Sequence, residues 1–132
     1  MDDSNELVKI PIVKMKDVLL ARFVIRKEAE RLKFSASEIT ALSTATSEIA
    51  RNAMQYASDG SLEATLTRDG EKEGIRIIIA DKGDGIEDLD KFLNAESTMG
   101  SGIPGSRSLM DDFNIQTGAG EGTTVTMVKW KG

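Results

Sequence analysis

The chain has 132 residues, a formal net charge of −5, no cysteine and no histidine. The missing residue types exclude disulfides, zinc–thiolate sites, thiol nucleophiles, imidazole bases and the phosphoacceptor of a histidine kinase. The acidic balance argues against nucleic acid as a partner. No apolar run approaches the roughly 18 residues of a membrane span, and the start is acidic. We therefore expect one cytoplasmic domain over residues 1–132 that binds neither nucleic acid nor membrane.

The first half of the chain predicts one strand and two helices. Residues 6–13 alternate loosely and are rich in β-formers, and Pro11 favours an edge position. Residues 15–33 carry apolar side chains at helical spacing and end in a basic turn. The sequence SASE at 35–38 fits a capping box, so a second helix begins there and ends near residue 57.

The second half of the chain predicts a sheet. Residues 74–86 begin with an apolar, β-branched run that breaks at Asp81, which is typical of a central strand. The other expected elements are strands at 61–70, 113–117 and 123–130, a helix at 103–112 and at most a short polar helix at 87–99. This order favours an α+β two-layer sandwich, with a mixed, mostly antiparallel sheet and helices on one face, over a doubly wound parallel sheet.

The sequence GSGIPG at 100–105 matches the dinucleotide fingerprint G-x-G-x-x-G. That motif and the P-loop both need a preceding strand, and the segment before it is polar instead. Ser106 also stands where a P-loop needs lysine. Two interpretations remain, a turn that caps the next helix or a phosphate loop of another architecture.

The second helix carries a polar pair at the margin of its apolar stripe. Glu48 and Asn52 are four residues apart, which places them within about 40° of each other. They are either an ordinary polar margin or a catalytic ledge, where a carboxylate takes a proton and an amide oxygen holds Mg²⁺. The stripe itself comprises Leu42, Ala45, Ile49, Ala53 and Tyr56.

The sequence DKGDG at 81–85 follows the apolar run directly. A structural turn is one interpretation. However, Asp81 continues a buried strand, so its carboxylate is expected to be partly buried and to need hydrogen-bond donors. Gly83 and Gly85 leave room for a flat ring against the backbone. A carboxylate here would accept a hydrogen bond from the exocyclic amine of adenine and reject guanine, which offers a carbonyl.

Four motifs in this order resemble those of the GHKL ATP-binding superfamily. SEIARNAMQYA resembles the N box, DKGDG the G1 box, GSGIPG the G2 box and GEGTT the closing motif, and the resemblance spans about residues 6–130. Within the superfamily the chain is most similar to the RsbT-type switch serine/threonine kinases of the stressosome. The length, the wording SEIARN, the LMDDF after the glycine loop, the final VKW and Pro104 within the loop all point to this branch.

The resemblance implies ATP and Mg²⁺ as cofactors. It implies Glu48 as general base, Asn52 as magnesium ligand and Asp81 as acceptor for the adenine amine. The remaining implied nucleotide-binding residues are Gly83 and Gly85 at the base, Gly100, Ser101, Gly102 and Gly105 around the phosphates, and Thr124 beside Asp81. Arg107 is a weaker candidate, either a phosphate contact or a solvated helix charge.

The resemblance also implies partners. The chain would phosphorylate a serine or threonine of a STAS-domain protein in a stressosome-like assembly and, when released, activate a PP2C-type phosphatase by binding it. Two alternatives stay open, an anti-sigma factor kinase that binds a sigma factor directly and a non-catalytic ATP-binding adaptor. The intact pair of Glu48 and Asn52 argues against the adaptor.

Overall fold

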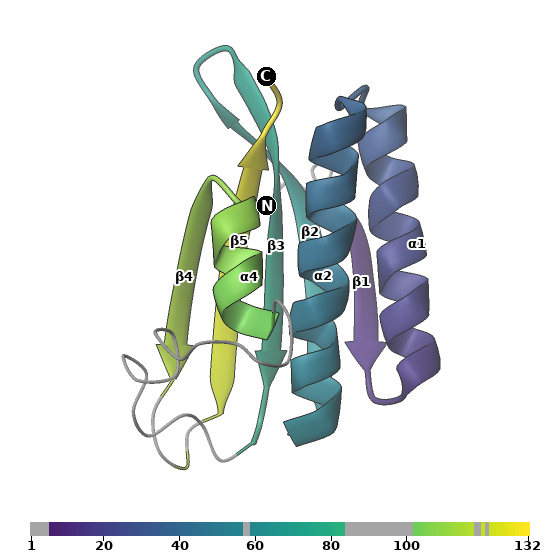
Figure 1. The fold of residues 1–132 in the computed structure, drawn as a ribbon, viewed down its shortest axis with the longest axis vertical. Helices are drawn as coiled ribbons and strands as arrows, with labels where there is room; N and C mark the ends of the chain where they lie inside the picture. The colour runs from purple at the N-terminus through teal and green to yellow at the C-terminus, as the bar shows by residue number, and fades with distance from the viewer. Residues whose placement is uncertain (1–5, 57–58, 84–101, 118–119, 121) are drawn as a thin grey trace.

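The computed structural model describes residues 6–56, 59–83, 102–117, 120 and 122–132. Figure 1 shows two layers, a sheet and a set of helices on one of its faces. Within the described part, no helix is long and apolar enough to cross a membrane. The elements in chain order are β1 (Glu6–Ile12), α1 (Met15–Arg31), α2 (Ala36–Tyr56), β2 (Gly60–Asp69), β3 (Lys72–Asp81), α4 (Gly102–Leu109), β4 (Asp112–Thr117) and β5 (Thr123–Trp130).

The sheet has the strand order β1-β2-β3-β5-β4, and each of these four neighbouring pairs is antiparallel. The α+β sandwich is confirmed, but the sheet of the described residues is antiparallel rather than mixed. The reason is that the chain passes from β3 to the far edge at β4 and returns beside β3 as β5. Pro11 lies in β1 at the other edge, as predicted, where its missing N–H disrupts no ladder.

The alternation of β3 decides which residues face the helices. Ile75, Ile77 and Ile79 are buried on the helix-covered face, whereas Arg76 between them is exposed on the other. Because side chains alternate strictly along a strand, Asp81 at the end of β3 shares the helix-covered face. The sequence thus ends an apolar row with a carboxylate.

Helix α2 lies across the middle of this face and supplies much of the core. Leu42, Ala45, Ile49 and Ala53 of the predicted stripe are buried, while the side chain of Tyr56 lies outside the described residues. Helix α1 packs against α2 and β1, and its buried residues are spaced three and four apart, namely Val18, Ala21, Ile25 and Ala29.

The connection between α1 and α2 is held at both ends. Lys33 adopts a φ of 67°, and the N–H of Phe34 donates to the Ala29 carbonyl at 3.0 Å, so α1 closes in a Schellman-type turn two residues before its predicted end. The predicted capping box of α2 is present. The Ser35 N–H donates to Glu38 Oε1 at 2.8 Å, and the Glu38 N–H donates to Ser35 Oγ at 3.2 Å.

Glu38 also ties this connection to the end of the chain, because its Oε2 accepts from the Gly132 N–H at 2.7 Å. Burial raises the pKa of Glu38, but the hydrogen bonds from Ser35 and Gly132 together outweigh burial and lower the pKa below its usual range.

Trp130 joins the start of β4 to the end of β5. Its backbone N–H donates to Asp111 Oδ2 at 2.7 Å, and its indole Nε1 donates to Asp112 Oδ2 at 3.1 Å. The Lys72 ammonium lies 5.2 Å from the centre of the ring. The carboxylates of the sequence LMDDF therefore hold the tryptophan of VKW, which fixes the corner between α4 and β4.

Candidate functional site

Several strand and helix ends meet at one end of the molecule. Figure 1 shows that β3 ends, β5 begins, β4 ends and α4 begins at the same end, beside the last turns of α2. This arrangement follows from the antiparallel order of the sheet, because a strand that ends here lies beside a strand that begins here. The predicted site residues that the structure describes come from these segments.

Glu48 and Asn52 lie one turn apart on α2, and both are half-buried. The Glu48 side chain is 22% exposed, and both of its carboxylate oxygens accept from Arg51 Nη1 at 3.1 Å. The pair therefore sits at the edge of the core, as predicted. Arg51 is not among the predicted site residues, although an arginine three residues after a glutamate is at the spacing at which helical side chains meet.

Asp81 is half-buried at the end of β3, as predicted from the apolar run before it. Its Oδ1 accepts the N–H of Gly83 at 3.0 Å. Within the described part of the chain, the other oxygen of Asp81 accepts no hydrogen bond. The carboxylate is thus fixed by its own turn and keeps one acceptor for a ligand.

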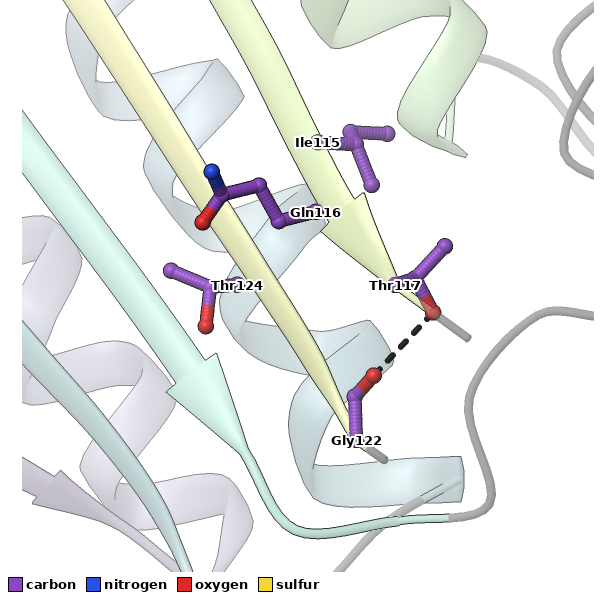
Figure 2. A pocket seen from close by; sticks show the side chains of 5 residues that line it. All are labelled: Ile115, Gln116, Thr117, Gly122 and Thr124. Atoms are coloured by element: carbon purple, nitrogen blue, oxygen red, sulfur yellow. Dashed lines mark hydrogen bonds between the residues drawn. The ribbon is translucent and has the colours of Figure 1, made fainter. Parts of the chain in front are cut away.

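Two threonines extend this polar position across the sheet. Thr123 is the direct partner of Asp81 in the β3–β5 ladder, and Thr117 is the direct partner of Thr123 in the β4–β5 ladder. Directly opposed residues project from the same face of a sheet. The hydroxyls of Thr117 and Thr123 lie 2.9 Å apart, and the Thr117 hydroxyl donates to the Gly122 carbonyl at 3.1 Å, drawn as a dashed line in Figure 2.

The expected position of Thr124 beside Asp81 is corrected by the register. Thr124 is opposite Ala80 and Gln116, so its side chain projects from the face that the helices leave open. Figure 2 views the sheet from that face, with α2 behind the strands, and shows Thr124 lining an open pocket with Gln116. The physical reason is the period of two, because neighbouring threonines on one strand point to opposite faces.

Gly122 lies against the backbone of Asp81. Its φ is 76°, and a Cβ built on it would lie 2.3 Å from the Asp81 carbonyl oxygen. The position therefore needs glycine for two reasons, its left-handed backbone and the close approach of the neighbouring strand. Gly122 has no predicted role of its own within the GEGTT motif, and the glycine before paired threonines is the signal for it.

The glycine-rich loop is described in part. Gly102 and Gly105 lie in α4, and the helix begins within the GSGIPG segment, as predicted. Arg107 in the last turn of α4 is exposed, so the described contacts leave both interpretations of it open. Gly85, Gly100, Ser101 and the possible helix at 87–99 lie outside the described residues.

The chemistry of this end is carboxylate and amide oxygen. Among the described residues, no group of three acidic, cysteine or histidine side chains could hold a metal ion by itself. Glu48, Asn52 and Asp81 instead offer single oxygen atoms at the end where α4 begins, and the first backbone N–H groups of a helix have no partner within that helix. Such an arrangement suits a ligand that brings phosphates, because the ligand then completes the coordination.

Comparison with known proteins agrees with this geometry. Residues 14–129 match the family model described as the histidine kinase-like ATPase domain. The serine/threonine-protein kinase RsbT of Bacillus subtilis (strain 168) is 35% identical over 130 residues, which cover 96% of this chain and 98% of that protein. The anti-sigma F factor of Caldanaerobacter subterraneus subsp. tengcongensis is 28% identical, over 98% of this chain and 97% of that protein.

A solved structure shows the same fold. The RsbU and RsbW domains of a Mycobacterium tuberculosis protein align with a TM-score of 0.66 at 22% identity, over 92% of this chain and 31% of that chain. With the matched domain and the relative at 35% identity, this chain belongs to the histidine kinase-like ATPase family and, within it, to the RsbT-type serine/threonine kinases.

Proposed function

We propose that this kinase transfers the γ-phosphoryl group of ATP to a serine or threonine of a STAS-domain protein, with Mg²⁺ as cofactor. The observation that carries the proposal is that Glu48, Asn52 and Asp81 come from elements that meet at one end of the fold, beside the start of α4. Such a transfer needs three groups from the protein, namely a carboxylate that acts as general base, a metal ligand and a carboxylate that binds adenine.

Asp81 binds the base of the nucleotide. Its free oxygen accepts the exocyclic amine of adenine, while Gly83 fixes the carboxylate from the other side at 3.0 Å. Thr123, rather than Thr124, supports this position because it is the direct partner of Asp81. Guanine presents a carbonyl at this edge, so two acceptors would face each other and GTP would bind less well.

Glu48 acts on the acceptor hydroxyl. It takes the proton as the hydroxyl oxygen bonds to the γ-phosphorus and the bond to the β-phosphate oxygen breaks, which releases ADP. Arg51 holds both oxygens of Glu48 and so limits the orientations of the base. The amide oxygen of Asn52, half-buried one turn away, fits a hard cation that takes few ligands from protein. Mg²⁺ neutralises phosphate charge when it is bound.

The glycine-rich loop wraps the phosphates. Gly100, Ser101, Gly102 and Gly105 supply close backbone N–H groups, and the start of α4 faces the same charge. Gly85 shapes the base pocket with Gly83. Arg107 is a weaker candidate, because its exposed position in the last turn of α4 lies away from the start of the helix.

The relatives support a proposal about the partners of this kinase. We place the chain in the cytoplasm, in a stressosome-like module where phosphorylation of the STAS-domain partner releases the kinase to activate a PP2C-type phosphatase. The similarity to RsbT supports this assignment. The 28% identity to an anti-sigma F factor favours a second candidate, a kinase that binds a sigma factor directly. Co-purification of a sigma factor with the full chain would favour the second candidate.

A phosphotransfer assay tests the catalytic assignment. Wild type with labelled ATP, Mg²⁺ and a candidate STAS-domain protein should transfer label, and Glu48→Gln should slow transfer by about 10²-fold or more, because a general base is lost. Glu30→Gln is the matched control, since Glu30 also accepts helical ion pairs, from Arg26 and Lys27, and lies on the exposed side of α1. No transfer by wild type, or equal rates for Glu48→Gln and wild type, would contradict the assignment.

A further inference from the structure

The large apolar side chains that are exposed in the described part of the chain lie in one segment. They are Val13, Met15, Leu19, Leu20 and Phe23, with exposed fractions of 58%, 43%, 59%, 48% and 57%. We call this set, with the basic residues between and beside it, the α1 outer face (residues 13–27). Scattered exposed apolar residues need no explanation, but a set gathered on one helix marks an interaction site.

Helix geometry turns these residues into a ridge. Val18, Ala21 and Ile25 face the core. Met15, Leu19 and Phe23 are spaced by four and therefore line up on the side of α1 away from the core, with Leu20 beside them. A helix that is buried on one side and apolar on the other is fitted to contacts on both sides.

The start of the ridge is held in place. Asp17 Oδ2 accepts the N–H of Lys14 at 2.9 Å and that of Val13 at 3.0 Å. These hydrogen bonds lower the pKa of Asp17 below its usual range, so the turn stays closed at neutral pH. Val13 is therefore presented outward by a fixed turn and not by a frayed end.

The α1 outer face is basic in an acidic protein. Residues 13–27 contain five basic side chains and one acidic one, against a net charge of −5 for the whole chain. The Lys27 ammonium lies 5.5 Å from the centre of the Phe23 ring. Arg26 and Lys27 pair with Glu30, whereas Lys16 and Arg22 have no ion pair within the described residues. The ridge is thus apolar with positive flanks.

Charge selects the occupant. A second copy of the chain would bring two positive faces together, which is unfavourable. An anionic membrane would attract the face but repel the net negative charge of the rest of the chain. A helix with apolar anchors at i, i+3 or i+4 and i+7 and with acidic flanks satisfies both the ridge and its charge. We propose that the α1 outer face docks such an acidic amphipathic helix from a partner protein.

The place of α1 in the fold assigns this partner a role. Figure 1 shows α1 over β1, at the opposite edge of the sheet from β4 and α4. A helix bound to the outer face of α1 leaves the end of β3, with Asp81, uncovered. This partner therefore binds the kinase without being its phosphoryl acceptor. That role rests on the proposed kinase function, whereas the docking does not rest on it.

A displayed library of random peptides about 16 residues long tests the docking without a named partner. Selection on the full-length protein should enrich peptides with Leu, Ile or Phe at helical spacing and Asp or Glu between them. A synthetic copy of the most enriched peptide should bind Leu19→Glu about tenfold or more weakly than wild type. It should also bind wild type more weakly as salt rises from about 50 to 200 mM. Thr40→Glu is the matched control, because it places the same charge at another exposed helical position.

Three results would overturn the proposal. One is no enrichment, or enrichment of basic peptides. Another is a wild-type dimer in sedimentation that Leu19→Glu dissociates, which assigns the face to a second copy. The third is binding to phosphatidylserine vesicles that Leu19→Glu abolishes. Circular dichroism checks that the variant is folded. Phosphotransfer by Leu19→Glu should proceed at the same rate as phosphotransfer by wild type. If the wild-type protein selects acidic peptides but transfers no label, the kinase function is wrong and the docking proposal stands.

Discussion

Gly122→Ala tests whether the backbone around Asp81 is built for the nucleotide. The new Cβ would lie 2.3 Å from the Asp81 carbonyl oxygen and 3.2 Å from the Lys82 Cα, whereas ordinary contacts begin at 3.4 Å. The end of β3 must therefore move by about 1 Å. Since Asp81 and Thr123 are direct partners in the ladder, that movement separates the carboxylate from its support.

Gly120→Ala provides the matched control. Both glycines have a φ of 76°, but a Cβ at Gly120 would meet nothing within 4 Å. In Gly120→Ala only the left-handed backbone conformation is unfavourable for the new side chain. The free energy of unfolding should therefore fall by about 1–2 kcal/mol, which lowers Tm by roughly 4–8 °C. Gly122→Ala carries that cost and the clash as well, so we expect about 3 kcal/mol or more.

Nucleotide affinity separates the two variants further. A hydrogen bond to a charged group contributes about 1.5–3 kcal/mol, so displacing Asp81 should weaken ATP binding by about tenfold or more in Gly122→Ala. Gly120→Ala should bind ATP as wild type does. Thermal unfolding and titration with a fluorescent ATP analogue measure the two quantities. Equal ATP affinity and equal Tm for the two variants would refute the close contact with Asp81 as the reason for glycine.

Three further predictions concern Asp81, Arg51 and the pair of carboxylates with lowered pKa values. Asp81→Asn should lower ATP affinity and reduce the preference for ATP over GTP, and unchanged affinity in a competition titration would exclude its adenine role. Arg51→Gln should slow phosphotransfer at unchanged ATP affinity, because Glu48 loses the side chain that orients its carboxylate. The free energy of unfolding should fall by only about 0.5 kcal/mol. A phosphotransfer rate equal to that of wild type would remove Arg51 from the mechanism. The pKa values of Asp17 and Glu38 are lowered in the folded protein, so in acid the unfolded chain binds more protons than the folded chain. The urea midpoint of unfolding should therefore stay constant above about pH 5 and fall as the pH drops through the folded pKa values. A midpoint that is independent of pH between about 7 and 3 would contradict these hydrogen bonds.

The sequence predicts the layers of this fold because periodicity reports burial. The alternation in the strands and the 3.6-residue spacing in α2 identify the core faces, and an apolar run that ends at Asp81 predicts a half-buried carboxylate. The end of α1 is less visible in the sequence. A left-handed closing residue is usually glycine, whereas here it is Lys33, so the predicted helix runs on past Arg31.

The site is predictable where the roles depend on helix or strand period, and unpredictable where they depend on register. Glu48 and Asn52 follow from a spacing of four. The choice between Thr123 and Thr124 depends on which residue of β5 lies opposite Asp81. The sequence of one strand alone does not determine its register with a neighbouring strand. The same holds for Gly122, whose need for glycine comes from a neighbouring strand.

Trp130 makes one corner of the molecule observable by light. It is the single tryptophan of the chain, with a carboxylate on its indole nitrogen and an ammonium over its ring. Its emission should therefore report the joint between α4, β4 and β5, at the opposite end of these elements from the nucleotide. A change in tryptophan fluorescence on ATP addition would mean that α4 transmits events at its glycine-rich start along its whole length, and an unlabelled protein suffices to measure it.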